Sequence, residues 1–115
     1  MVKVILAAFQ GEAMCFVHVL LNALDMQARG MEARIIVEGL AVKLPPELAK
    51  PDHIFHDLYR RTKEAGLIEG VCQACATKMG TLEAIKAEGL PLLADMSGHP
   101  SLGRYLAAGY TILTF

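Results

Sequence analysis

The chain lacks several features that would assign it at once to a common class of protein. Its 115 residues contain no tryptophan, and aromatic side chains make up only 6%. Basic and acidic residues number 11 and 12 without clustering, so no charged patch indicates binding to nucleic acid or to an anionic membrane. No apolar run reaches the ~20 residues of a membrane-spanning helix. We therefore expect neither nucleic acid nor a membrane as a partner.

Common cofactor and catalytic motifs are missing as well. The turn after the first apolar segment reads FQGEA, without the glycine spacing of a phosphate-binding loop. There is no G-x-S-x-G nucleophile motif and no pair of catalytic carboxylates. We expect no bound cofactor, so any chemistry has to come from the side chains themselves.

What the sequence does contain is a large aliphatic fraction, which brings the hydrophobic share to 54%. This share is high for a small chain and indicates a subunit interface, so we expect a homo-oligomer. The length fits a single domain over residues 1–115. The N-terminus enters an apolar strand pattern without a signal-peptide cleavage region, which predicts a cytoplasmic protein. In that reducing compartment three cysteines argue against a disulfide framework and favour chemistry, metal binding or core packing.

Strand and helix patterns alternate along the whole chain. The apolar runs predict five strands, at Lys3–Phe9, Ala33–Val37, Leu67–Cys72, Leu90–Ala94 and Tyr110–Phe115. Helical spacing predicts helices over about 13–29, 51–65, 81–87 and 101–108, and a long loop at Gly39–Lys50. This alternation is typical of an α/β fold with a mostly parallel sheet and right-handed crossovers.

In such folds, binding and catalytic sites collect where the strands end at their carboxyl side. The loops that follow the first four strands should therefore meet at one edge of the sheet. They include the turn Cys72–Cys75 and the loop Asp95–Pro100, which contains His99. His99 is a candidate acid, base or orienting group for the cysteines, and Cys15, in the first turn of the first helix, is a candidate neighbour.

The segment Ile68–Gly80, IEGVCQACATKMG, carries the strongest chemical signal. It holds Cys72 and Cys75 in C-x-x-C spacing where a strand passes into a helix. Free backbone N–H groups and the helix dipole at such a junction favour a thiolate, which predicts a nucleophilic cysteine near neutral pH. Three other interpretations stay open: inert packing, a thioredoxin-like disulfide pair, and a zinc site with His53 and His56 as the remaining ligands. We expect no metal.

Four segments together resemble the DsrE/DsrF-like family of small sulfur-relay proteins, which includes the Tus sulfur carriers. They are the opening KVILAAFQGEAMCFVHVLLNALD, the second strand with V-E-G-L-A-V-K-L, the third with V-C-Q-A-C-A-T-K-M-G, and the closing T-I-L-T-F. The chain departs from the family at Ala41, where a glycine is common, and at Lys78-Met79, where some carriers have a pair of arginines.

The resemblance implies a three-layer α/β/α domain with a five-stranded sheet, assembled as a trimer or hexamer. It implies that Cys72 carries sulfane sulfur as a persulfide, received from a protein donor and passed to a protein acceptor. Cys75 would then be a resolving or second acceptor thiol. The alternative hypothesis is a non-catalytic oligomeric subunit that binds a small ligand or a protein at the same sheet edge.

Overall fold

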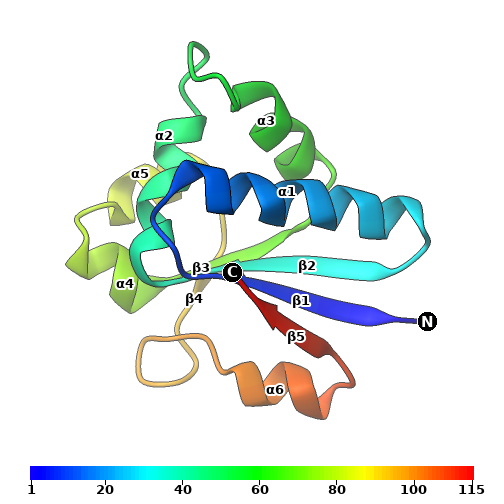
Figure 1. The fold of residues 1–115 in the computed structure, drawn as a ribbon. Helices are drawn as coiled ribbons and strands as arrows, with labels where there is room; N and C mark the ends of the chain where they lie inside the picture. Colours follow the sequence, from blue (N-terminus) through cyan, green and yellow to red (C-terminus); the bar gives the residue numbers. More distant parts are fainter.

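The computed structural model describes all 115 residues and contains one five-stranded sheet (Figure 1). The strand order is β4-β3-β2-β1-β5, and every neighbouring pair is parallel. The strands are β1 (Lys3–Ala8), β2 (Glu32–Val37), β3 (Ile68–Cys72), β4 (Leu92–Leu93) and β5 (Thr111–Thr114). This arrangement confirms the predicted α/β class with a parallel sheet.

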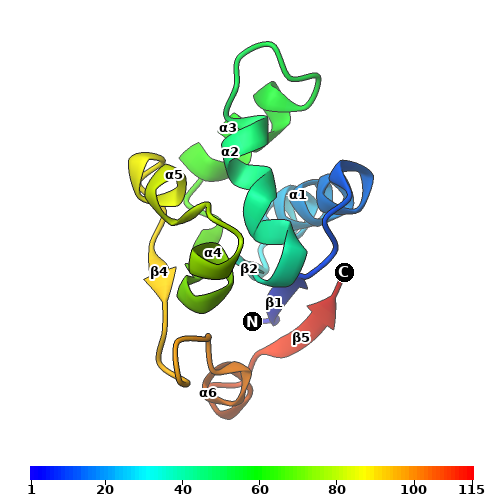
Figure 2. The same ribbon diagram turned by 90° about the vertical axis from the view of Figure 1, so that its left-hand side faces the viewer.

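The helices lie in two layers of unequal size. They are α1 (Ala13–Ala28), the 3-10 helix η1 (Gly39–Lys43), α2 (Leu44–Leu48), α3 (His56–Glu64), α4 (Gln73–Lys78), α5 (Leu82–Ala87) and α6 (Leu102–Ala107). Figures 1 and 2 show α6 alone on one side of the sheet and the other helices on the opposite side. The fold is thus a three-layer α/β/α sandwich, and no helix is both long and apolar enough to cross a membrane.

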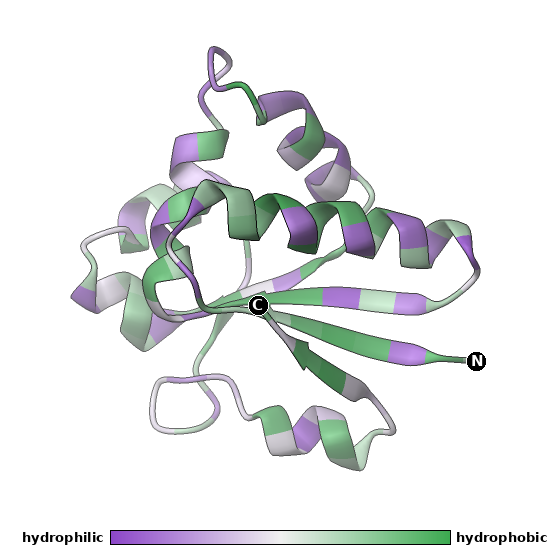
Figure 3. Cartoon of the chain, viewed as in Figure 1, coloured by the Kyte–Doolittle hydropathy of each residue, from purple (hydrophilic) through white to green (hydrophobic).

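The core is built on the two central strands. Figure 3 shows the apolar stretches of β1 and β2 in the middle of the molecule. Residues Val4–Ala8 are all buried, as expected for a central strand covered on both faces. Side chains of alternate residues enter a large cluster beneath α1, and the others enter a small cluster with Tyr105 of α6. The continuous apolar run in the sequence therefore reflects burial on two sides.

The segment after β2 differs from the prediction. Gly39–Lys50 was expected to be a loop, but most of it forms η1 and α2. Pro45 and Pro46 lie in the first turn of α2, where the missing N–H of proline costs nothing. The next helix, α3, was expected from about residue 51 but begins only at His56, and Ile54, just before it, is 84% exposed.

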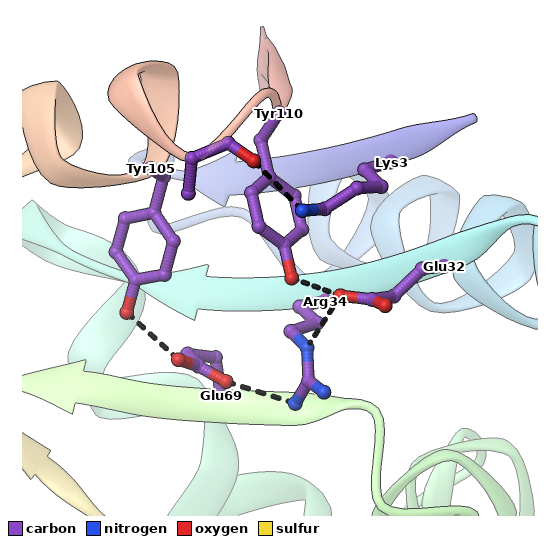
Figure 4. Close-up of polar contacts among 7 residues, drawn as sticks. Lys3, Glu32, Arg34, Glu69, Tyr105 and Tyr110 are labelled. Carbon is purple, nitrogen blue, oxygen red and sulfur yellow. Dashed lines mark hydrogen bonds and ion pairs between the residues drawn. The ribbon is translucent and has the colours of Figure 1, made fainter. Parts of the chain in front are cut away.

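A polar network fastens α6 to the sheet (Figure 4). A register shift in the β2–β3 pairing gives β3 one extra residue, Glu69, which accepts hydrogen bonds from Tyr105 at 2.8 Å and from Arg34 at 3.1 Å. Tyr110 donates to Glu32 in the same network. Burial, with the carboxylate of Glu69 alongside, raises the pKa of Tyr105 to about 12, so its hydroxyl remains a donor. The network therefore fixes the helix that follows the His99 loop.

Candidate functional site

The C-x-x-C segment forms the junction between β3 and α4. Cys72 ends the strand and is the N-cap residue of the helix, where its Sγ accepts a hydrogen bond from the backbone N–H of Cys75 at 3.4 Å. The side chain of an N-cap residue lies over the first helical turn, next to the residue that follows the cap by three positions. The spacing of two residues between the cysteines therefore places their thiols side by side.

His99 reaches this junction from a tight turn between β4 and α6. Backbone hydrogen bonds of 2.7 and 2.9 Å join Met96 and His99 across the turn, whose two central residues, Ser97 and Gly98, both have positive φ. The carbonyl of Gly98 accepts a further bond of 2.9 Å from the N–H of Ala74, on α4. The turn is thus fixed directly to the helix that begins at Cys72.

These contacts bring two thiols and one imidazole together. The Sγ of Cys72 lies 3.1 Å from Nδ1 of His99, and the Sγ of Cys75 lies 3.9 Å from the same nitrogen. One atom from each residue falls within a group whose members are all within 4.8 Å of one another. His99 is 27 residues from Cys72 in sequence, so the tertiary fold creates this contact.

The environment of Cys72 differs from the one that the sequence predicted. Its side chain is fully buried, and this burial raises the pKa of the Cys72 thiol to about 11. The N–H of Cys75 lowers the pKa, but the neighbouring Cys75 thiol and the charge of Glu38 raise it further. The expectation of a lowered pKa at Cys72 is therefore wrong: desolvation of the thiolate outweighs the hydrogen bond at the helix terminus.

Sequence reasoning did not identify Glu38 as a site residue. It follows β2, and because Val37 pairs with Val71, it lies beside Cys72 at the sheet edge. Its side chain is 8% exposed, and its Oε2 has no hydrogen-bond partner. Burial raises the pKa of Glu38, while the nearby His99 opposes this shift. The signal in the sequence was an acidic residue directly after the apolar run of a central strand.

Cys75 is the thiol that faces the surface. It is only partly buried, and it lines a pocket of about 220 Å³ together with Gly39, Leu40, Lys78 and Met79. Leu40 and Met79 are 54% and 39% exposed. The site therefore has an outer thiol at an apolar pocket and an inner thiol that contacts the imidazole.

The other candidate residues lie outside this group. Cys15 lines a different pocket with His18, Asn22 and Phe115. Nδ1 of His53 accepts the N–H of Phe55 at 3.0 Å, and His56 contacts the carbonyl of Leu48 at 2.9 Å. Both histidines thus shape the connection between α2 and α3, and the zinc interpretation that used them is not supported.

Replacement of Gly98 by alanine tests the position of the His99 turn. Gly98 has φ +89°, where a side chain is strained, and an added Cβ would lie 3.3 Å from the Cβ of Ala74. We expect Gly98→Ala to lower the free energy of unfolding by about 1–2 kcal/mol and to shift the NMR signals of the His99 ring. Gly109→Ala is the matched control, because φ is +92° there but nothing lies within 4 Å of the added Cβ. Equal His99 shifts in both variants would contradict this account of the turn.

Comparisons with known proteins identify relatives of this chain. No protein-family model matches it. It is 36% identical over 96 residues to the uncharacterized protein MJ0733 of Methanocaldococcus jannaschii, an alignment that covers 84% of this chain and 76% of the relative. A conserved protein of unknown function from Bacteroides thetaiotaomicron, BT1422, shares its fold with a TM-score of 0.73 at 23% identity, over 98% of this chain and 94% of that one. The chain belongs to the same family as MJ0733.

Proposed function

We propose that this chain is a small cytoplasmic sulfur-relay protein of the DsrE/DsrF-like kind. It carries sulfane sulfur as a cysteine persulfide and passes it to a partner protein. The observation that carries the proposal is the pair of thiols around one imidazole, with Cys75 facing a surface pocket and Cys72 buried behind it. A reducing compartment keeps both thiols available.

Cys75 is the entry point for sulfur in this proposal. Its thiolate attacks the terminal sulfur of a donor persulfide. A bond forms between Sγ of Cys75 and that sulfur as the S–S bond of the donor breaks, and the donor leaves as a thiolate. The sulfane sulfur only changes carriers, so no external oxidant or reductant is needed. The pocket beside Cys75 gives the donor access to the thiol.

Cys72 is the storage position. Nδ1 of His99, 3.1 Å away, is placed to take the proton of the Cys72 thiol. The resulting thiolate attacks the sulfane sulfur on Cys75, and Cys75 leaves as a thiolate that takes the proton back. A persulfide at the buried position is shielded from thiols in solution. The high pKa of Cys72 gives His99 a role, because the thiol does not ionise readily by itself.

Partner proteins would approach at the apolar rim of the pocket, where Leu40 is 54% exposed. A homo-oligomer, either a trimer or a hexamer, belongs to the same proposal and rests on the high apolar content of the chain. A non-catalytic binding subunit is the second candidate. The complete burial of Cys72 favours it, since small buried thiols also serve as core packing.

Intact mass spectrometry of the reduced protein after treatment with a small-molecule persulfide donor tests the relay. We expect the wild type and the control variant Cys15→Ser to gain one sulfur that survives brief exposure to a small thiol. Cys72→Ser should lose its sulfur in that exposure, because the adduct stays on the accessible Cys75. Cys75→Ser should gain sulfur slowly, because only the buried Cys72 is left to accept it. The relay would be rejected if the wild type gained no sulfur, or if the double variant Cys72→Ser/Cys75→Ser gained as much as the wild type. The non-catalytic binding subunit would then be the remaining hypothesis.

A further inference from the structure

The ligand atoms at the cysteine junction have the spacing of a tetrahedral metal site. Zinc binds thiolate sulfur at about 2.3 Å and imidazole nitrogen at about 2.0–2.1 Å, which places sulfur and nitrogen ligands roughly 3.5 Å apart. The two sulfur-to-Nδ1 distances, 3.1 Å for Cys72 and 3.9 Å for Cys75, lie on either side of this value. The two sulfur atoms lie within 4.8 Å of each other, against roughly 3.8 Å between two thiolate ligands of one zinc ion, so side-chain shifts of about 1 Å or less would bring all three atoms to bonding distance of one cation.

Buried Glu38 is a second, independent observation at the same place. It is 8% exposed, one of its carboxylate oxygens has no partner, and no basic side chain forms an ion pair with it. An unpartnered buried carboxylate is costly unless a positive charge lies nearby. In the extended backbone after β2, Glu38 continues the register beside Cys72, whose Sγ contacts Nδ1 of His99. A divalent cation among the thiols would supply the missing charge.

We propose that Cys72, Cys75 and His99 form a binding site for a thiophilic divalent cation, of which zinc is the best match. Thiolate and imidazole ligands favour zinc over harder cations such as magnesium or calcium, which prefer oxygen ligands. Glu38 lies outside the group of three and acts as an outer partner that stabilises the charge of the bound metal. Three protein ligands would leave a fourth position for water, and the pocket that Cys75 lines would be the route of access.

This inference stands on the geometry and does not depend on persulfide chemistry. If both activities exist, they exclude each other, because the metal uses the sulfur lone pairs that attack a persulfide. Zinc would then hold the thiols in an inactive, protected form. The site also differs from the zinc site considered from the sequence: His99 takes the place of His53 and His56, whose ring nitrogens contact the backbone elsewhere.

Titration of the full-length, reduced and chelator-treated protein with Co²⁺, followed by displacement with Zn²⁺, tests the proposal. We expect one cobalt ion per chain, with thiolate-to-cobalt charge-transfer bands and the intense visible bands of tetrahedral coordination. Zinc should remove these bands. It should also protect Cys72 and Cys75 of the wild type from alkylation, a readout that needs no variant. Absence of stoichiometric binding by the wild type would overturn the proposal.

Variants distinguish the residues that bind the metal directly from those that only surround it. Cys72→Ser, Cys75→Ser and His99→Ala should each abolish the tetrahedral cobalt spectrum. Glu38→Gln should keep the spectrum and weaken zinc binding by about 10–100-fold, as other outer partners do. Cys15→Ser and His53→Ala are matched controls that should bind as the wild type does. Unchanged affinity in all three ligand variants would place the metal elsewhere and reject the site. Metal binding without a sulfur adduct would reject the relay and leave this proposal standing.

Discussion

Replacement of Gly70 by alanine is expected to destabilise the protein by about 2–3 kcal/mol, the usual cost of overpacking a core. Gly70 lies on β3, where an added Cβ would be 2.6 Å from Cγ of Leu93 and 2.9 Å from the carbonyl oxygen of Pro91. The second contact is with backbone, so the neighbouring strand β4 would have to move. We expect a melting temperature lower by roughly 10 °C, measured by thermal and urea denaturation.

Gly103→Ala is the matched control for this substitution. Gly103 lies in α6, and the nearest atom to its added Cβ is Oγ of Ser101 at 3.8 Å. Because alanine favours a helix over glycine by up to about 1 kcal/mol, this variant should be as stable as the wild type or more stable. A wild-type melting temperature for Gly70→Ala would show that β4 is not packed against β3 as described. The two-residue strand β4 precedes the His99 turn, so Gly70→Ala should also disturb the site.

Alkylation of the metal-free native protein at about pH 8 should label Cys75 well before Cys72. With a pKa of about 11, roughly 0.1% of the Cys72 thiol is ionised at that pH, compared with about a quarter of a free cysteine of pKa ~8.5. We therefore expect Cys72 to react more than about 100-fold more slowly than a free cysteine. Its rate should rise about tenfold per pH unit until the pH approaches the pKa. Peptide mass mapping after timed quenching measures both rates.

Two controls show whether burial and charge are responsible. In denaturant, the reactivities of the cysteines should become similar, because the unfolded chain exposes all of them. Glu38→Gln should speed the labelling of Cys72 in the native protein, since the charge of Glu38 raises the pKa of this thiol. Native Cys72 reacting as fast as Cys75 would contradict the buried environment described for it.

The sequence predicted the secondary structure best where local signals were strong. The helix α1 follows from apolar residues at helical spacing, and β1 and β2 follow from continuous apolar runs. The prediction failed at Gly39–Lys50, where Pro45 and Pro46 suggested a loop. Proline excludes a helix only beyond its first turn, and a sequence pattern does not show where that first turn lies.

For the candidate site, the sequence by itself determined the partners that are close along the chain. The C-x-x-C spacing places two thiols in one helical turn, and the alternation of strands and helices places the His99 loop at the same sheet edge. Only the tertiary structure decided the rest. The contact of His99 with Cys72, the buried position of Glu38 and the raised pKa of Cys72 all depend on segments far apart in sequence. Burial is a property of the packed molecule, and it reversed the electrostatic effect that local reasoning assigned to the helix terminus.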